Sequence, residues 1–200
     1  MTLASGTPRR RGRPSVLDTD DVVAKAFHLW STHGYAATSW QDLAAATGVS
    51  ARTLLRHFPS KSDIAWLGVE PATERLTAAL ATTADDVPLG DAVRHAIAES
   101  VSHEPHVQRV SADWLRLISS EPELVAMAPA AYRPWIGVLA GFIGRRLPEA
   151  PASVCRAIAT AYQAATFDAL LSWAELAPDI DSADAVAEAL RWLTITIPTP

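Results

Sequence analysis

The chain has 200 residues, of which 49% are hydrophobic and 20% are charged. This composition excludes a disordered chain, since enough apolar surface is available for the core of one or two domains. The single cysteine, Cys155, excludes an internal disulfide framework and a cysteine-rich zinc site, and it fits a reducing compartment. No apolar stretch approaches the roughly 18 residues that cross a bilayer, and residues 1–15 lack the apolar region of a secretory signal. We therefore expect a cytoplasmic protein.

Charge is unevenly distributed along the sequence, although the formal net charge is −5. Residues 1–61 carry eight basic and four acidic side chains, whereas the remainder carries nine basic and eighteen acidic ones. Half of the basic side chains in the first segment belong to one short run, which contains Arg9, Arg10, Arg11 and Arg13. Glycine and proline within and after this run disfavour a helix, so residues 1–16 are predicted to form a flexible basic arm. A basic N-terminal segment followed by an acidic remainder is typical of a protein that binds a polyanion.

Apolar residues recur at spacings of three and four, and strand-like alternation is rare, which predicts an all-α fold of about nine helices. The most clearly bounded helices are expected near residues 18–33, 40–47, 51–58, 61–83, 152–177 and 182–196. Pro71 is expected to kink or split the fourth of these helices.

Side chains at two helix starts have the spacing of a capping box, in which a hydroxyl and a residue three positions later satisfy free backbone N–H groups. Either Thr38 or Ser39 is expected to begin the second helix, with Thr38 and Gln41 as the box. Ser60 and Asp63 form the corresponding pair at the fourth helix. Both helix starts are therefore predicted to be well defined.

Residues 40–58 contain a short helix, a tight glycine turn and a second short helix, which is the pattern of a helix-turn-helix motif. In this motif the second helix enters the major groove of DNA. If Leu54 and Phe58 face the core, steps of about 100° per residue place Arg52 and Arg56 on the opposite, outward face. Two neighbouring guanidiniums there match guanine edges or phosphates. The alternative is that both arginines are merely solvated.

Several short elements follow one another in a defined order: Gly12-Arg13-Pro14, His33-Gly34-Tyr35, Ala37-Thr38-Ser39, Leu43-Ala44, Gly48-Val49-Ser50, Thr53-Leu54 and Phe58-Pro59-Ser60-Lys61. In this order and spacing, residues 12–64 resemble the DNA-binding head of the TetR family of bacterial one-component repressors. The resemblance implies a helix-turn-helix domain at residues 17–62 and an effector-binding and dimerisation domain at residues 63–200. It also implies a homodimer that binds double-stranded operator DNA and leaves it when a small effector binds.

The resemblance, together with the geometry of the second short helix, implies a set of DNA contacts besides the arginines of the arm. These contacts are Thr38, Ser39, Gln41, Ser50, Ala51, Arg52, Thr53, Leu55, Arg56, His57 and Lys61. Two positions depart from the family pattern: Leu55 stands where tyrosine is common, and Arg52 stands where a small residue is usual. A leucine cannot donate a hydrogen bond to a phosphate, so any contact of Leu55 must be apolar, for instance with a thymine methyl group. Because both positions depart from the pattern, the operator sequence cannot be taken from better-known relatives.

Four residues of the second half are candidates for binding the effector. Trp114, Tyr132 and Trp135 lie on segments that, by the resemblance, line the effector cavity of the family. Arg133 lies on the same segments and suits an anionic ligand. The alternative is an ordinary place in the core for each aromatic residue and a solvated face for the arginine.

The last two expected helices combine small and large apolar residues at three–four spacing, which allows close helix packing. By the resemblance, these helices form the dimer interface. The candidate interface residues are Ile158, Ala161, Tyr162, Ala165, Ala169, Trp173 and Leu190. The alternative is that this face covers the chain's own core.

Other chemistry has little support in the sequence. His103 and His106 suggest a metal site, but Pro105 interrupts the helix that would align them and no third ligand is obvious. Cys155 lies in an apolar run, which favours an inert buried thiol over a redox sensor. No nucleophile, phosphate-loop or dinucleotide motif is found, so neither an enzyme nor a cofactor is expected. The leading hypothesis is a repressor, and the alternative is a helical ligand-binding protein without specific DNA readout.

Overall fold

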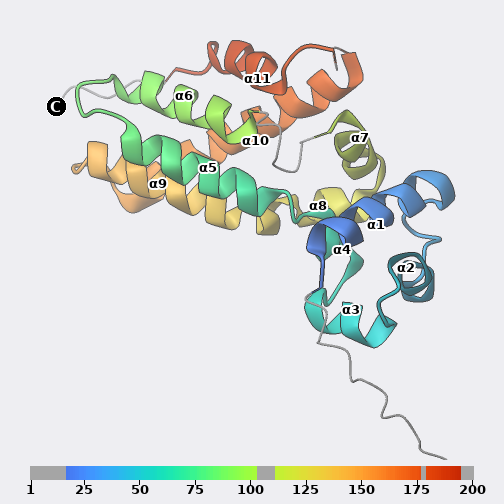
Figure 1. Ribbon diagram of the computed structural model, residues 1–200. Helices are drawn as coiled ribbons and strands as arrows, with labels where there is room; N and C mark the ends of the chain where they lie inside the picture. The colour runs from blue at the N-terminus through green and yellow to red at the C-terminus, as the bar shows by residue number, and fades with distance from the viewer. Residues whose placement is uncertain (1–16, 103–110, 177–178, 195–200) are drawn as a thin grey trace, which may run out of the picture.

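The computed structural model describes residues 17–102, 111–176 and 179–194, and this part of the chain folds into eleven α-helices with no strand. The all-α class is therefore confirmed, and the helices outnumber the nine or so expected. Figure 1 shows a small head beside a longer helical body. The helices are α1 (Thr19–His33), α2 (Trp40–Thr47), α3 (Ala51–His57), α4 (Lys61–Ala65), α5 (Val69–Thr82), α6 (Leu89–Val101), α7 (Ala112–Ser120), α8 (Pro122–Ala131), α9 (Arg133–Arg146), α10 (Ala152–Leu176) and α11 (Ser182–Leu190). The predicted arm, with Arg9, Arg10, Arg11 and Arg13, lies outside the described residues.

The head consists of α1, α2 and α3, which bury their apolar faces against one another. Trp30 of α1 contacts Tyr35 edge to face, with ring centroids 5.1 Å apart. Leu43 of α2 and Leu54 of α3 are fully buried in the same core, and Phe58 closes it after α3. At Gly48 the backbone has a φ of 71°, a conformation that glycine adopts without steric cost, so the chain can turn sharply from α2 into α3.

The start of α2 differs by one residue from the capping box predicted for it. Ser39 is the N-cap, and its hydroxyl accepts a hydrogen bond from the Asp42 backbone N–H while the Asp42 carboxylate accepts one from the Ser39 N–H. The predicted pair of Thr38 and Gln41 is therefore wrong. The Thr38 side chain is 3% exposed, because its hydroxyl turns inward and donates to the Gly34 carbonyl oxygen at 2.8 Å. The box predicted at Ser60 and Asp63 is confirmed.

The segment 61–83, predicted to be kinked or split at Pro71, is two helices, and the break lies before Pro71 rather than at it. α4 ends at Ala65, and α5 begins at Val69 after Gly68. Pro71 lies in the first turn of α5, where a backbone N–H has no helical partner and its absence costs little. The last helix also differs in length, because α11 ends at Leu190 instead of continuing to residue 196.

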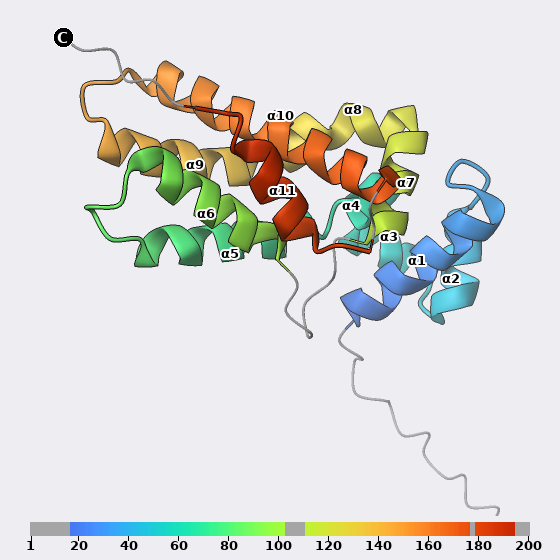
Figure 2. The same ribbon diagram turned by 90° about the horizontal axis from the view of Figure 1, so that it is seen from above.

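The body is a ring of five helices around an apolar core. α5 packs against α6, α6 against α11, α11 against α10, α10 against α9, and α9 against α5. Figure 2 shows this arrangement from above, with α10 and α8 on the side opposite to α5. α7 and α8 lie at the end of the ring next to the head, where α7 contacts α1 and α8 contacts α4. Within the described ranges, no helix is long and apolar enough to cross a membrane.

Candidate functional site

The second helix of the helix-turn-helix motif, α3, presents a cationic face to solvent. Arg52 and Arg56 are exposed, whereas Leu54 is fully buried, so the orientation predicted from the sequence is confirmed. Neither guanidinium forms an ion pair with another described side chain, and the α3 sequence contains no acidic residue. Figure 1 places α3 at the end of the head that is farthest from the body. The helix is therefore free to approach a polyanion.

The other predicted contacts of the motif fall into three groups by exposure. Ser39, Gln41, Ser50, Leu55 and His57 are exposed. Ala51, Thr53 and Lys61 are half-buried, and Thr38 is buried. For Thr38 the prediction of a side-chain contact is wrong, because its hydroxyl already donates within the head.

Ser50 begins α3, and its side chain accepts a hydrogen bond from the Thr53 backbone N–H at 3.2 Å. The Ser50 and Thr53 hydroxyl oxygens also lie 2.9 Å apart, which holds the first turn of the helix. The N-terminal turn of α3 is thus fixed by hydrogen bonds within the helix itself.

Lys61 connects α4 to the loop between α1 and α2. Its ammonium donates hydrogen bonds to the carbonyl oxygens of Tyr35, at 2.6 Å, and Thr38, at 2.9 Å. It also lies 4.4 Å from the centroid of the Tyr35 ring, a cation–π contact. Two of the three ammonium donors are therefore used inside the protein. These bonds position α4 against the head. One ammonium donor of Lys61 remains for the phosphate contact that was predicted for it.

A small cavity lies in the body between α5, α9 and α10. Trp114, Tyr132 and Trp135, the three aromatic residues predicted to bind an effector, all lie on its wall. Its remaining lining residues are Gly68, Val69, Ala72, Val101, Gln163, Thr166 and Leu170. The volume is about 20 Å³, which holds roughly one water molecule. None of these lining side chains is charged.

Two of the aromatic residues on the cavity wall, Trp114 and Tyr132, pack against the ring of Trp66. The ring centroid of Trp66 lies 5.7 Å from that of Trp114 and 5.7 Å from that of Tyr132, and Phe167 lies 6.1 Å from Trp66. Burial raises the pKa of Tyr132, so its hydroxyl stays protonated. Trp66 is not among the residues predicted from the sequence, where its place two residues before Gly68 was the available signal.

Besides the packing of α7 against α1 and of α8 against α4, two side-chain hydrogen bonds run from the body toward the head among the described residues. The Trp114 indole N–H donates to the carbonyl oxygen of Ala65, the last residue of α4, at 2.6 Å. The Tyr35 hydroxyl lies 3.5 Å from Glu123 Oε1 on α8. Burial, together with the nearby Glu123 carboxylate, raises the pKa of Tyr35 to about 12, so this hydroxyl is a donor at neutral pH. A wall residue of the cavity is thus bonded directly to the helix that Lys61 attaches to the head.

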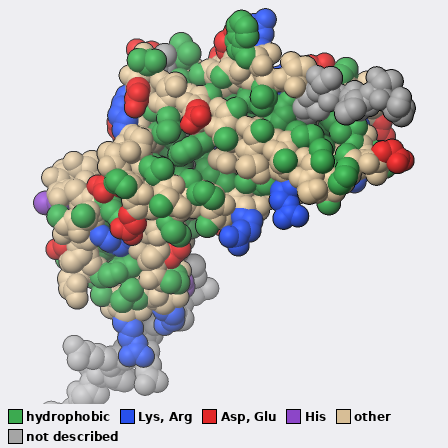
Figure 3. Space-filling view, turned by 180° about the vertical axis from the view of Figure 1, so that it is seen from behind, with side chains coloured by type: hydrophobic (Ala, Val, Ile, Leu, Met, Phe, Trp, Pro, Cys, Tyr) green, Lys and Arg blue, Asp and Glu red, His purple; other side chains and the backbone are tan. Residues whose placement is uncertain are grey.

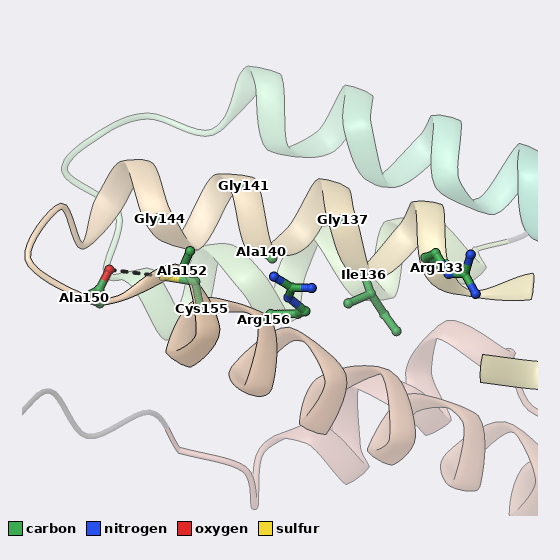
Figure 4. A pocket seen from close by; sticks show the side chains of 10 residues that line it. All are labelled: Arg133, Ile136, Gly137, Ala140, Gly141, Gly144, Ala150, Ala152, Cys155 and Arg156. Carbon is green, nitrogen blue, oxygen red and sulfur yellow. Dashed lines mark hydrogen bonds between the residues drawn. The ribbon is translucent and has the colours of Figure 1, made fainter. Parts of the chain in front are cut away.

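Arg133 is not part of the cavity, so the prediction that it lies with the three aromatic residues is wrong. It is exposed at one end of an open groove between α9 and α10, whose volume is about 560 Å³ (Figure 4). Gly137, Gly141 and Gly144 lie along the α9 side of this groove. Cys155 lies beside it and is 3% exposed, as expected for an inert thiol.

The residues predicted for the dimer interface divide between the core and the surface. Tyr162, Trp173 and Leu190 are buried within their own chain. The Tyr162 hydroxyl donates to the Leu193 carbonyl oxygen at 3.4 Å, and the Trp173 indole to that of Ile180 at 2.8 Å. For these three residues the prediction is wrong, because the chain itself covers their side chains.

The other four predicted interface residues lie nearer the surface of α10. Ile158, Ala165 and Ala169 are half-buried against the core, and Ala161 is exposed. The exposed face of α10 around Ala161 also carries Val154, Ala157 and Ala164. Seen from behind, hydrophobic side chains cover much of the body (Figure 3).

The histidines considered as metal ligands, His103 and His106, lie outside the described residues. Within the described part of the chain, no three His, Cys, Asp or Glu side chains are grouped so that they could hold a metal ion.

Comparison with known proteins gives two family matches and several relatives. Residues 22–65 match the family model of bacterial regulatory proteins of the tetR family, and residues 87–198 match the model of the MftR C-terminal domain. A Mycobacterium tuberculosis (strain ATCC 25618 / H37Rv) protein named as a mycofactocin biosynthesis transcriptional regulator, MftR, is 30% identical over 145 residues, which are 68% of this chain and 69% of that protein.

Two solved structures share the fold across most of the chain. Thermus thermophilus FadR in complex with lauroyl-CoA has a TM-score of 0.55 at 20% identity, covering 91% of this chain and 98% of that one. A transcriptional regulator from Saccharomonospora viridis in complex with choline has a TM-score of 0.51 at 22% identity, covering 86% and 93%. These likenesses concern the fold alone.

Proposed function

This chain belongs to the TetR family of transcriptional regulators, and we propose that it acts in the cytoplasm as a homodimeric repressor that leaves a palindromic operator when a small effector binds. One observation carries the proposal. A wall residue of the body cavity is hydrogen-bonded to a five-residue helix, α4, which is itself bonded to the head. Trp114 holds its last carbonyl oxygen, and Lys61 holds its first turn to the loop before α2.

The chemistry of the cavity supports an uncharged, largely apolar effector group. Its wall is mostly aliphatic and aromatic, and the polar groups of Gln163, Thr166 and Tyr132 are neutral. A cation would find no carboxylate there, and a phosphate would find no lysine or arginine. Burial of an ion without a partner is unfavourable by several kcal/mol, so an ionic group would remain outside. The acyl chain of the lauroyl-CoA bound by the Thermus thermophilus relative has the required chemistry.

The size of the cavity supports release by a shift of population. Ligand pockets usually enclose about 300–1,000 Å³, whereas this cavity encloses about 20 Å³. An effector therefore binds only to molecules whose aromatic wall has moved apart, and it stabilises that state. Movement of Trp114 breaks its bond to the Ala65 carbonyl oxygen, and α4 then loses the hydrogen bond that joins it to α7.

The exposed face of α10 is the best-supported site for a second copy of the chain. It carries the alanines Ala157, Ala161 and Ala164 beside the apolar Val154, and the short alanine side chains let a partner helix approach closely. A dimer is needed because one recognition helix reads too few base pairs, and two heads must meet successive major grooves.

Effector release of DNA tests the proposal. An operator would be selected from a random duplex library with the full-length protein, and its binding followed by fluorescence anisotropy with added lauroyl-CoA, coenzyme A or choline. We expect lauroyl-CoA alone to release the DNA. Release by choline alone would contradict an uncharged apolar effector. A chain that selects no sequence would contradict the repressor and favour a ligand-binding protein without DNA readout.

A further inference from the structure

Leu55 is an exposed apolar side chain on the helix that faces the major groove. Its exposed fraction is 44%, although exposure of an apolar leucine side chain to water does not stabilise the folded protein. Every other large hydrophobic side chain that is exposed within the described residues lies in the body: Val125, Met127, Val154, Leu176, Ile180 and Trp192. In the described part of the head, Leu55 therefore stands alone in this respect.

The neighbours of Leu55 on the helix surface are the two exposed arginines. On an α-helix, Leu55 is rotated by about 60° from Arg52 and about 100° from Arg56, so the three side chains form one continuous surface. Both arginines are long and carry donors that suit guanine or phosphate, whereas Leu55 has no polar atom. Its buried neighbour Leu54 shows that α3 is firmly seated in the head core, so this face is not turned inward.

The major groove offers one apolar group to such a side chain, the 5-methyl group of thymine. We propose that Leu55 recognises this methyl group in each half of the operator, at a base pair adjacent to one contacted by Arg52 or Arg56. The inference rests on the DNA-binding role of α3 given above. It makes Leu55 a specificity-determining residue that reads shape and hydrophobicity where the arginines read hydrogen-bonding groups.

Replacement of thymine by uracil isolates this contact, because deoxyuridine lacks the 5-methyl group and keeps every hydrogen-bonding group of the base pair. Burial of one methyl-sized group contributes about 0.8 kcal/mol, which corresponds to a factor of about four in affinity. Since the operator has two equivalent halves, substitution in both should weaken binding about 15-fold. A cytosine that carries a 5-methyl group at the same position should bind more tightly than plain cytosine, since it presents the same methyl group.

The experiment combines modified DNA with variants at one position. Duplexes of the selected operator, each with one symmetric pair of thymines replaced by deoxyuridine, would be titrated by anisotropy with the unchanged protein, Leu55→Ala and Leu55→Met. Because the side chain is exposed, both variants should fold, which circular dichroism would verify. We expect one thymine position at which uracil weakens the unchanged protein and Leu55→Met but leaves Leu55→Ala unaffected.

The possible outcomes separate this inference from the proposed function. A Leu55→Ala protein that still distinguishes thymine from uracil as strongly as the unchanged protein would overturn the methyl contact alone. So would an operator in which no uracil substitution matters. A protein that selects no operator at all would overturn both the repressor and the methyl contact.

Discussion

Replacement of Lys61 by methionine separates a positioning role from a phosphate contact. Methionine keeps an unbranched apolar stem of similar length but removes the ammonium, and with it the hydrogen bonds to the Tyr35 and Thr38 carbonyl oxygens. Hydrogen bonds from charged groups contribute about 1.5–3 kcal/mol each. Since Lys61 is half-buried, we expect the lower value of this range for each of its two hydrogen bonds, and therefore a loss of about 3 kcal/mol in the free energy of unfolding. For a chain of this size the melting temperature should fall by about 6–12 °C.

The sequence contains one other lysine, Lys25, and it provides the matched control. Lys25 forms a partly exposed ion pair with Asp21 at 2.7 Å within α1. Such i,i+4 pairs contribute about 0.3–0.5 kcal/mol, so Lys25→Met should leave the melting temperature nearly unchanged. Thermal unfolding followed by circular dichroism measures both variants.

The salt dependence of operator binding measures the alternative role of Lys61. Each phosphate neutralised by a basic side chain contributes about 0.9 to the slope of log affinity against log salt concentration. A dimer that lost two such contacts would change its slope by about 1.8. We expect Lys61→Met to keep the slope and lose stability. A variant with unchanged stability and a reduced slope would refute the positioning role.

Four further predictions concern the head, the cavity and the dimer. Arg52→Ala should cost about 1–3 kcal/mol at one operator position and relax specificity there, as measured by competition between operator variants. Trp114→Phe keeps an aromatic ring and removes the indole donor that bonds α4, so operator binding should respond to lauroyl-CoA at lower concentrations while the melting temperature falls only slightly. Hydrogen bonds from the Ser39 side chain and backbone hold the pKa of Asp42 below its usual value of 3.8. The ionised Asp42 carboxylate therefore stabilises the folded protein fully above pH 3.8, and this stabilisation is lost as the pH falls below that value. Urea unfolding between pH 2 and 6 should show this loss in the unchanged protein but not in Asp42→Asn. Ala161→Glu with Ala164→Glu should give a monomer by light scattering that keeps its helicity and no longer binds the operator.

Local patterns in the sequence were sufficient for the orientation of α3 and for the turn before it. The outward placement of Arg52 and Arg56 follows from the helical repeat once Leu54 is assigned to the core, and the turn at Gly48 follows from glycine's freedom at positive φ. Both depend on residues within one helical turn of each other. The capping box predicted at the start of α2 is wrong by one position, because Thr38 and Ser39 are adjacent and either hydroxyl could have formed the N-cap.

Contacts between distant segments could not be predicted in the same way. The Trp114 indole and its acceptor on Ala65 are 49 positions apart, and Lys61 lies 26 positions from Tyr35. In α10, the apolar spacing identifies residues such as Tyr162 and Trp173 as packing residues but does not tell whether the same chain or a second copy covers them. That distinction depends on where α7, α9 and α11 pack against α10, which is a property of the whole ring.

The small volume of the aromatic cavity has a consequence for the timing of the response. An effector that enters only after the wall has opened cannot bind faster than the wall opens, and collective motions of this kind take microseconds to milliseconds or longer. The rate of effector binding should therefore rise with effector concentration at first and then reach a plateau equal to the opening rate. Beyond that plateau a larger supply of effector raises occupancy but brings no earlier release, so the protein itself sets the shortest delay between signal and transcription.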